Sequence, residues 1–390
     1  MRTKAARPIR ERDLQRWRLL ERFQVALAAE VEQRGGLKGT WVDPDRKLQL
    51  EQYLSLFLFG LFNPVVESMR GLCEASELGR VQREVCGRRV SLGSFSEAQA
   101  VIDPALLKGV LERLQPDADV PEPSGQWRGQ ERIIDSTVWR ALPRMTWAFW
   151  RGGHGLGSAV RLHVELDVQT GQVRQAELTR AKKCERAQWR ELAQPGICNI
   201  GDRYYGYDYK QLGELERNGT AFVVRLRIDA QWVEEQSEVL SAADQAADVT
   251  WAGAVRLGKD GGGPRVRVVQ ILGEEESVLV ATSLPAEDFP PAWIAQCYRH
   301  RWQVEMFFRW LKCILGCRHW LAESESGVAI QVYLALIAAQ LMVLYCGERP
   351  NRRQMEAIQF YFMGWATLPE LIAKLRSAPS PRTSTSSKKR

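Results

Sequence analysis

The chain has 390 residues, of which 45% are hydrophobic and 26% charged, so it is an ordinary globular protein and not a disordered one. This length exceeds one compact core and suggests two or three domains. The net charge of +7 and the pI of about 9.0 fit a polyanionic partner, although proteins that never bind nucleic acid also carry such charges. The eight cysteines are scattered, which favours reduced thiols and a cytoplasmic protein. Cys313, Cys317 and His319 could suggest zinc, but they lie in an apolar run without a second pair, so buried thiols are favoured.

The first part of the chain, from about residue 10 to 115, has apolar residues at helical spacing and predicts a helical region. The segment LEQYLSLFLFGLFNP predicts a short hydrophobic helix that is stopped by Pro64. The Pro-rich, acidic stretch at residues 116–128 indicates a linker and the first domain boundary.

After the linker the pattern changes to short strands, turns and helices. ERIIDSTVW, SAVRLHVELDV and QVRQAELT read as strands, and Gly171 makes a tight turn between the last two. ERAQWRELA predicts a helix, and ICNIGD and TAFVVRLR predict further strands. This order implies a mixed sheet flanked by helices. Residues 229–288 are strand-like and rich in glycine, which predicts a small β insertion.

Two apolar segments follow the insertion. One long helix is expected to begin near Pro291 and to continue from Trp293 to Leu315. Residues 327–346 form an apolar run long enough to span a bilayer, but two glutamines interrupt it, so a buried core helix and no membrane partner are expected. The final residues, 377–390, are basic and of low complexity and predict a disordered tail.

A narrow polar stripe runs along the helix expected at residues 293–315. At 100° per residue, Tyr298, Arg301, Glu305 and Lys312 lie within about 60° of one another, and Arg309 joins them. The remaining surface is mostly apolar and suited to burial. The stripe fits a solvent face with ion pairs worth about 0.2–0.5 kcal/mol each. The alternative is a carboxylate that points into a site, with cations beside it that bind phosphate.

Two aspartates could join Glu305. Asp135 shares a strand face with Ile133, where a carboxylate is costly unless it is paired or metal-bound. Asp202 follows an apolar strand, at the end where α/β sheets usually bind ligands. Its neighbours are of types that contact phosphates and bases: Arg203, Tyr204, Tyr205 and Gly206. Each aspartate alone also fits a helix cap or a turn, but with Glu305 they could hold two Mg²⁺ or Mn²⁺ ions about 3.5–4 Å apart for phosphoryl transfer.

The segment YRHRWQVEMFFRWLK resembles the Y-(2)-R-(3)-E-(6)-K signature of bacterial insertion-sequence DDE transposases of the IS-four group, with Tyr298, Arg301, Glu305 and Lys312 at its four positions. IIDST and NIGDRYYG are similar to the family's two aspartate strands. The resemblance covers roughly residues 130 to 345. It implies an α/β fold with a ribonuclease-H-like catalytic domain, a β-rich insertion, a helical N-terminal domain and C-terminal helices.

The resemblance also implies function. Asp135, Asp202 and Glu305 would be catalytic metal ligands for two Mg²⁺ or Mn²⁺ ions. Further residues would bind DNA: Tyr298, Arg301, Lys312, Arg203 and Arg309. Trp232 and Trp251 are candidates for stacking a flipped base. The expected partners are double-stranded DNA with terminal inverted repeats, target DNA and a second copy of the chain, in the cytoplasm at the nucleoid.

The expected domain boundaries follow from these patterns. They are a helical N-terminal domain associated with DNA-end binding at 1–115, a linker at 116–128, the first part of the catalytic domain at 129–228, the insertion at 229–288, catalytic-domain helices at 289–346, a C-terminal helical segment at 347–376 and the tail at 377–390. The expected activity is metal-dependent DNA cleavage and strand transfer at insertion-sequence ends. The alternatives are a retired transposase that only binds DNA and a two-metal nuclease that does not join ends.

Overall fold

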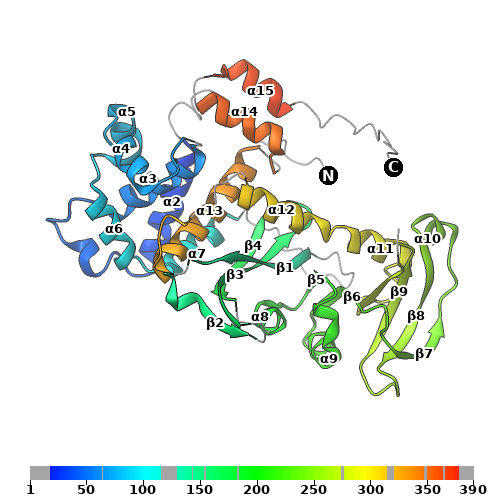
Figure 1. The fold of residues 1–390 in the computed structure, drawn as a ribbon. Helices are drawn as coiled ribbons and strands as arrows, with labels where there is room; N and C mark the ends of the chain where they lie inside the picture. The colour runs from blue at the N-terminus through cyan, green and yellow to red at the C-terminus, as the bar shows by residue number, and fades with distance from the viewer. Residues whose placement is uncertain are drawn as a thin grey trace.

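A mixed sheet with helices on both faces lies between a helical N-terminal region and a strand-rich extension (Figure 1). The structure is a computed structural model that describes residues 18–63, 65–115, 130–142, 144–152, 155–181, 184–273, 276–313, 320–346, 349–362 and 365–376. All residues of the expected linker at 116–128 and of the expected tail at 377–390 lie outside the described residues.

The N-terminal region is helical, as its spacing of apolar residues predicts. Its elements are α2 (Arg18–Gln33), η1 (Gly39–Val42), α3 (Leu50–Phe62), α4 (Met69–Ala75), α5 (Gly79–Val81), η2 (Gln82–Cys86), α6 (Leu92–Val101) and α7 (Ala105–Arg113). Helix α3 starts at a capping box formed by Gln49 and Gln52, and it ends one residue before Asn63. Most of its side chains are buried, so it is a core helix of this region.

Five strands form the middle of the sheet in the order β4-β3-β1-β5-β6. Their bounds are β1 (Gln130–Arg140), β3 (Gly155–Asp167), β4 (Val173–Arg180), β5 (Ile197–Gly201) and β6 (Ala221–Arg225). Strand β3 runs antiparallel to β1 and to β4, whereas β5 is parallel to both β1 and β6. Gly171 has a φ of +66° in the turn before β4, a conformation that favours glycine. The strands predicted here are therefore confirmed, with β2 (Phe149–Gly152) added beside β3.

The residues predicted as a β insertion extend this same sheet. They form β7 (Trp232–Ser237), α10 (Ala242–Ala246), β8 (Val249–Leu257), β9 (Arg265–Ile271) and β10 (Val278–Thr282). Strand β10 pairs antiparallel with β6, and the order then continues through β9 and β8 to β7. The insertion therefore shares backbone hydrogen bonds with the middle strands. Figure 1 shows it at one end of the sheet, with the N-terminal helices α2–α7 at the other end.

Helices cover the two faces of the middle strands because alternate residues on each strand point to opposite sides. Ile134 packs in a cluster with residues of α8 (Glu185–Leu192) and α9 (Tyr209–Arg217). Its neighbour Ile133 belongs to the other cluster, which includes residues of α11 (Pro291–Arg299), α12 (Trp302–Cys313) and α13 (Glu325–Cys346). Asp135, two residues after Ile133, is therefore on the strand face that α12 covers.

The expectation of one continuous helix from Trp293 to Leu315 was wrong at its centre. Helix α11 ends at Arg299 and α12 begins at Trp302. The backbone N–H groups of His300 and Arg301 bond to carbonyls three residues earlier, at 3.1 and 3.0 Å, instead of four. These tighter turns break the helical repeat, so the 100° spacing does not hold across the junction. Residues 314–319, at the end of the expected helix, lie outside the described residues.

Helix α13 is the apolar helix expected to lie in the core. It contacts α2, α3, α6, α7, α12 and β4, so it joins the N-terminal helices to the sheet. Among the described residues it is the one helix long and apolar enough to cross a membrane, and 89% of its apolar window is buried inside the protein. The chain then continues in α14 (Arg352–Phe362) and α15 (Leu368–Arg376).

Candidate active site

The two candidate aspartates lie on neighbouring parallel strands. Strands β1 and β5 pair Ile133 with Ile200, so the same register continued by two residues places Asp135 opposite Asp202. Asp202 is the first residue after β5, at the carboxyl end of the strand. The Asp135 carboxylate accepts a hydrogen bond from the Ser136 N–H at 2.7 Å, and that of Asp202 accepts one from the Tyr204 N–H at 2.8 Å. Among the described residues neither aspartate forms an ion pair.

Glu305 lies on the helix that packs against the face of β1 carrying Asp135. It lies in the first turn of α12, the helix that contacts β1. Its carboxylate accepts a hydrogen bond from the Arg301 guanidinium at 2.6 Å. The Glu305 side chain is 35% exposed and that of Arg301 is 19% exposed. The pair is thus partly shielded from solvent, on the face of the sheet that carries Asp135.

The charges of these residues influence one another. The pKa of Asp135 is raised to about 7, mainly by burial and in part by the negative charges of Asp202 and Glu305. The Ser136 N–H and the Arg301 charge act in the opposite direction. Burial also raises the pKa of Tyr298, while the positive charge of Arg301 lowers it and the negative charge of Asp202 raises it. The structure therefore places the three expected acids near enough to interact electrostatically, together with Arg301 and Tyr298.

Lys312 is anchored on the strand that carries Asp135. Its Nζ donates to the Thr137 Oγ1 and to the Val138 carbonyl at 3.3 Å, and it lies 5.2 Å from the centre of the Trp139 ring. Thr137 is two residues from Asp135, so both point to the same face of β1. Thr137 was not identified from the sequence, although the alternation of strand residues was a signal for it.

The other expected site residues lie around this centre or further away. Arg203 and Arg309 are exposed, in the turn after β5 and on α12. Trp232 and Trp251 lie on β7 and β8, where their rings stack on each other with centres 6.2 Å apart. Each of these two rings therefore has one face directed at its partner, and both pack against the buried cluster beside α9.

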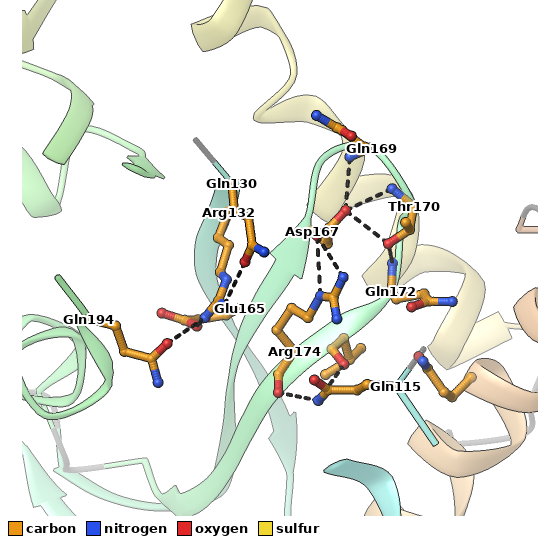
Figure 2. A network of polar contacts seen from close by, with 12 residues as sticks. Gln115, Gln130, Arg132, Glu165, Asp167, Gln169, Thr170, Gln172, Arg174 and Gln194 are labelled. Carbon is orange, nitrogen blue, oxygen red and sulfur yellow. Dashed lines mark hydrogen bonds and ion pairs between the residues drawn. The ribbon is translucent and has the colours of Figure 1, made fainter. Parts of the chain in front are cut away.

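Other acids on these strands have structural partners, as Figure 2 shows. The Arg132 guanidinium donates to Glu165 at 2.9 Å and to Gln194 at 3.1 Å. Arg174 bonds to Asp167 at 3.1 and 3.2 Å, and the Thr170 N–H and hydroxyl donate to the same carboxylate. These buried carboxylates are neutralised within the fold, which distinguishes them from Asp135 and Asp202.

The sequence matches the family described as "Transposase DDE domain" over residues 126–341, more than half of the chain. The chain belongs to the DDE transposase family.

Relatives of this transposase come from several bacteria. A protein of Sinorhizobium fredii (strain NBRC 101917 / NGR234) described as transposase y4zB is 26% identical over 261 residues, which cover 65% of this chain and 69% of that protein. A protein of Geobacillus stearothermophilus described as a transposase for insertion sequence element IS5377 is 25% identical, covering 54% and 55%. The transposase for insertion sequence element IS421 of Escherichia coli is 33% identical over 78 residues, covering 20% and 21%. A cryo-EM structure of a piggyBac transposase synaptic complex with hairpin DNA aligns at a TM-score of 0.45 and 12% identity, over 95% of this chain and 85% of that one.

The family makes this transposase a DNA-cleaving and strand-transferring enzyme that binds DNA. DDE transposases generally use divalent metal ions. Among the residues that the structure describes, no three His, Cys, Asp or Glu side chains are arranged as a ready set of metal ligands. The Glu305 carboxylate is paired with Arg301. The donor chemistry nevertheless fits a hard divalent cation: the candidate groups are all carboxylates, and their mutual repulsion is what a bound cation would relieve.

Proposed function

We propose that Asp135, Asp202 and Glu305 are the catalytic carboxylates of this transposase and that they hold two Mg²⁺ or Mn²⁺ ions. The observation that carries the proposal is the placement of the acids: Asp135 and Asp202 lie opposite each other on β1 and β5, and Glu305 lies on the helix that contacts β1. The pKa of Asp135 is accordingly raised to about 7, mainly by burial and in part by Asp202 and Glu305. Burying like charges beside one another is costly, and a bound cation would offset that cost. The strand order β4-β3-β1-β5-β6, with β3 antiparallel and β5 parallel to β1, supports a ribonuclease-H-like description of this unit.

Bound ions of this kind supply positive charge that activates water or a 3′-hydroxyl for attack and offsets charge on the departing 3′-oxygen. The chain's own residues prepare the site for that chemistry. Arg301 donates a hydrogen bond to the Glu305 carboxylate, and its guanidinium would be available to a DNA phosphate if that carboxylate turned toward Asp135. Lys312 and Arg309 on α12, with Arg203 after β5, add positive charge along the path of a DNA strand. Tyr298 is half-buried beside Arg301 and contacts a phosphate near the transferred end.

The substrates that fit the family resemblance are the inverted-repeat ends of an insertion sequence and a target duplex. We infer that two copies of the chain act on paired ends, with the helical N-terminal region recognising the repeats. Trp232 or Trp251 would accept a flipped base if one ring leaves the stacked pair, since each covers a face of the other. Joined products would distinguish this activity from hydrolysis by a nuclease.

Isosteric changes test the three acids. Asp135→Asn, Asp202→Asn and Glu305→Gln are each expected to abolish cleavage of DNA that carries the flanking element ends, in Mg²⁺ and read on a gel. Binding to the same DNA in EDTA should persist, because the amide variants keep the shape of each side chain and remove only its charge. Glu214→Gln on α9, in an ion pair with Arg190, is the matched control and should cleave normally.

A second measurement reports on the ions without cleavage. Mg²⁺ should raise the thermal unfolding midpoint of the unaltered transposase, because it relieves repulsion among the carboxylates. The stabilisation should be smaller in Asp135→Asn and Asp202→Asn. Near-normal cleavage by any of the three acid variants would show that the proposed catalytic set is wrong.

A further inference from the structure

The turn that follows Asp202 exposes two tyrosine rings next to the proposed metal ligands. The 3-10 turn η4 (Tyr205–Tyr207) connects β5 to α9. Tyr204 is 39% exposed and Tyr207 is 43% exposed, whereas Tyr205 between them is buried. The Tyr204 and Tyr207 rings have centres 6.2 Å apart and planes inclined by 57°. Two neighbouring exposed rings in the turn that begins at Asp202 are a candidate contact surface for a ligand.

The turn is held firmly in place. The ring of Tyr205 packs edge-on against Trp189 of α8, with centres 5.4 Å apart. A side chain at Gly206 would collide with the Arg225 carbonyl, so glycine is what lets the turn approach β6. The Asp202 carboxylate also accepts the hydrogen bond from the Tyr204 N–H. The two exposed rings are therefore pre-positioned relative to Asp202, which lowers the entropy cost of binding.

Arginines accompany both rings. The Arg186 guanidinium lies 5.0 Å from the centre of the Tyr204 ring, and its Nε is buried without a hydrogen-bond partner among the described residues. Arg227 lies 5.5 Å from the Tyr207 ring and is bound to Asp229 at 2.5 and 2.6 Å. The charge of Arg227 is therefore offset by Asp229. Arg186 interacts with Cys184 beside Tyr204, and exposed Arg203 adds positive charge in the same turn. Exposed aromatic rings beside arginines are suited to bases joined by phosphates.

We propose that Tyr204 and Tyr207 form a stacking surface for unpaired bases of the DNA strand that passes Asp202. The proposal rests on the proposed function, because it takes the position of the strand from the three acids. A ring face can contact a base face only after the base leaves the duplex stack. The rings project from a short turn, and duplex grooves are read by helices or two-stranded ribbons. The occupant is therefore unpaired DNA at the cleaved end, and stacking on tyrosine is tolerant of base sequence.

Fluorescence in EDTA tests the surface. The probe is an oligothymidylate of about 20 nucleotides with one 2-aminopurine, compared with a duplex of equal length. The Tyr204→Ala/Tyr207→Ala variant should bind the single strand at least about tenfold more weakly, and the 2-aminopurine should be quenched less. Duplex affinity should change by less than about twofold, since phosphate contacts dominate it. Tyr204→Phe/Tyr207→Phe keeps both rings and should bind like the unaltered protein.

The controls separate stacking from other effects. Tyr207→Ala alone leaves the contact of Tyr204 with Cys184 intact and should still weaken single-strand binding, so the test does not depend on the double variant folding normally. Trp365→Ala removes a 75% exposed ring beside α14 and α15, which Figure 1 shows on the opposite side of the sheet from α9, and should have no effect. Unchanged single-strand affinity in both alanine variants, or an equal loss for duplex and single strand, would overturn the proposal. Binding in EDTA requires neither metal nor cleavage, so this result is independent of whether Asp135, Asp202 and Glu305 are catalytic.

Discussion

Single residues around Asp135 differ in how firmly the fold holds them. Lys312 donates hydrogen bonds to Thr137 and Val138 of β1, which holds its ammonium group beside the strand that carries Asp135. Lys312→Ala and Arg301→Ala should each lower the slope of log affinity against log salt concentration by about one unit, because one phosphate contact is lost. Filter binding or anisotropy over a salt series measures it. Arg353→Ala, an exposed arginine on α14, should leave the slope unchanged.

A substitution at Thr137 separates the effect of the Lys312 charge from the effect of its position. Thr137→Val keeps the Lys312 charge but removes the hydroxyl that anchors it, so the salt slope should persist while cleavage falls by up to about a hundredfold. A salt slope that is the same in the unaltered protein and in Lys312→Ala would contradict the phosphate role of this lysine.

The residues of the site could be predicted to different degrees. Alternation on β1 placed Asp135 on the face of Ile133, and that face is the one covered by α12. The sequence suggested that Asp135 and Asp202 could join Glu305, but not that they lie on neighbouring strands, since strand order depends on contacts far apart in the sequence. Exposure of Tyr207 could not be predicted, because it follows from the close approach of Gly206 to β6.

At the scale of the elements, a hydrogen bond joins the insertion to α11, the helix that precedes α12 and Glu305. Asp244 of α10 is 3% exposed; its carboxylate accepts hydrogen bonds from Ser241 and from the Ala292 N–H in the first turn of α11. Burial alone would raise the pKa of Asp244, but these hydrogen bonds outweigh it and hold the pKa below its usual value. The ionised form is therefore the one that stabilises the fold.

Asp244→Asn should lower the free energy of unfolding by roughly 1.5–3 kcal/mol at pH 7, because hydrogen bonds to a charged group are lost. A depressed carboxyl pKa contributes stability that is present above the unfolded pKa and is lost as pH falls through the folded pKa. The difference between the two proteins should thus narrow below about pH 4, as measured by urea unfolding. Asp260→Asn, in an exposed turn of the same insertion, should have little effect. A difference that stays constant as the pH falls would refute the role of the Asp244 charge.

Helix and strand boundaries were easier to predict than their connections. Apolar spacing predicted most strands and the start of α11, but the break at His300 and Arg301 has no proline or glycine to mark it. The joining of β10 to β6 was also not predictable, because hydrogen bonding between strand edges leaves no local pattern. Periodicity therefore identified elements, and tertiary contacts decided how they continue.

On the scale of the whole molecule, one hydrophobic cluster connects parts that the sequence suggested were separate. Leu107 of α7, Ile133 of β1 and Leu336 of α13 belong to it and are each fully buried. Helix α13 lies among the N-terminal helices and also contacts β4. The N-terminal region and the middle strands should consequently unfold as one cooperative unit.

Leu107→Ala tests this cooperativity. It removes a fully buried side chain from α7 and should cost about 2–5 kcal/mol. If the molecule is one unit, amide exchange followed by mass spectrometry should accelerate by the same factor in β1 and β5 as in α7, because all open through the same global transition. Val239→Ala, at a 99% exposed position in the insertion, is the control and should leave exchange unchanged. Faster exchange confined to residues 18–115 and α13 would instead show that the N-terminal helices open independently of the strands that carry Asp135 and Asp202.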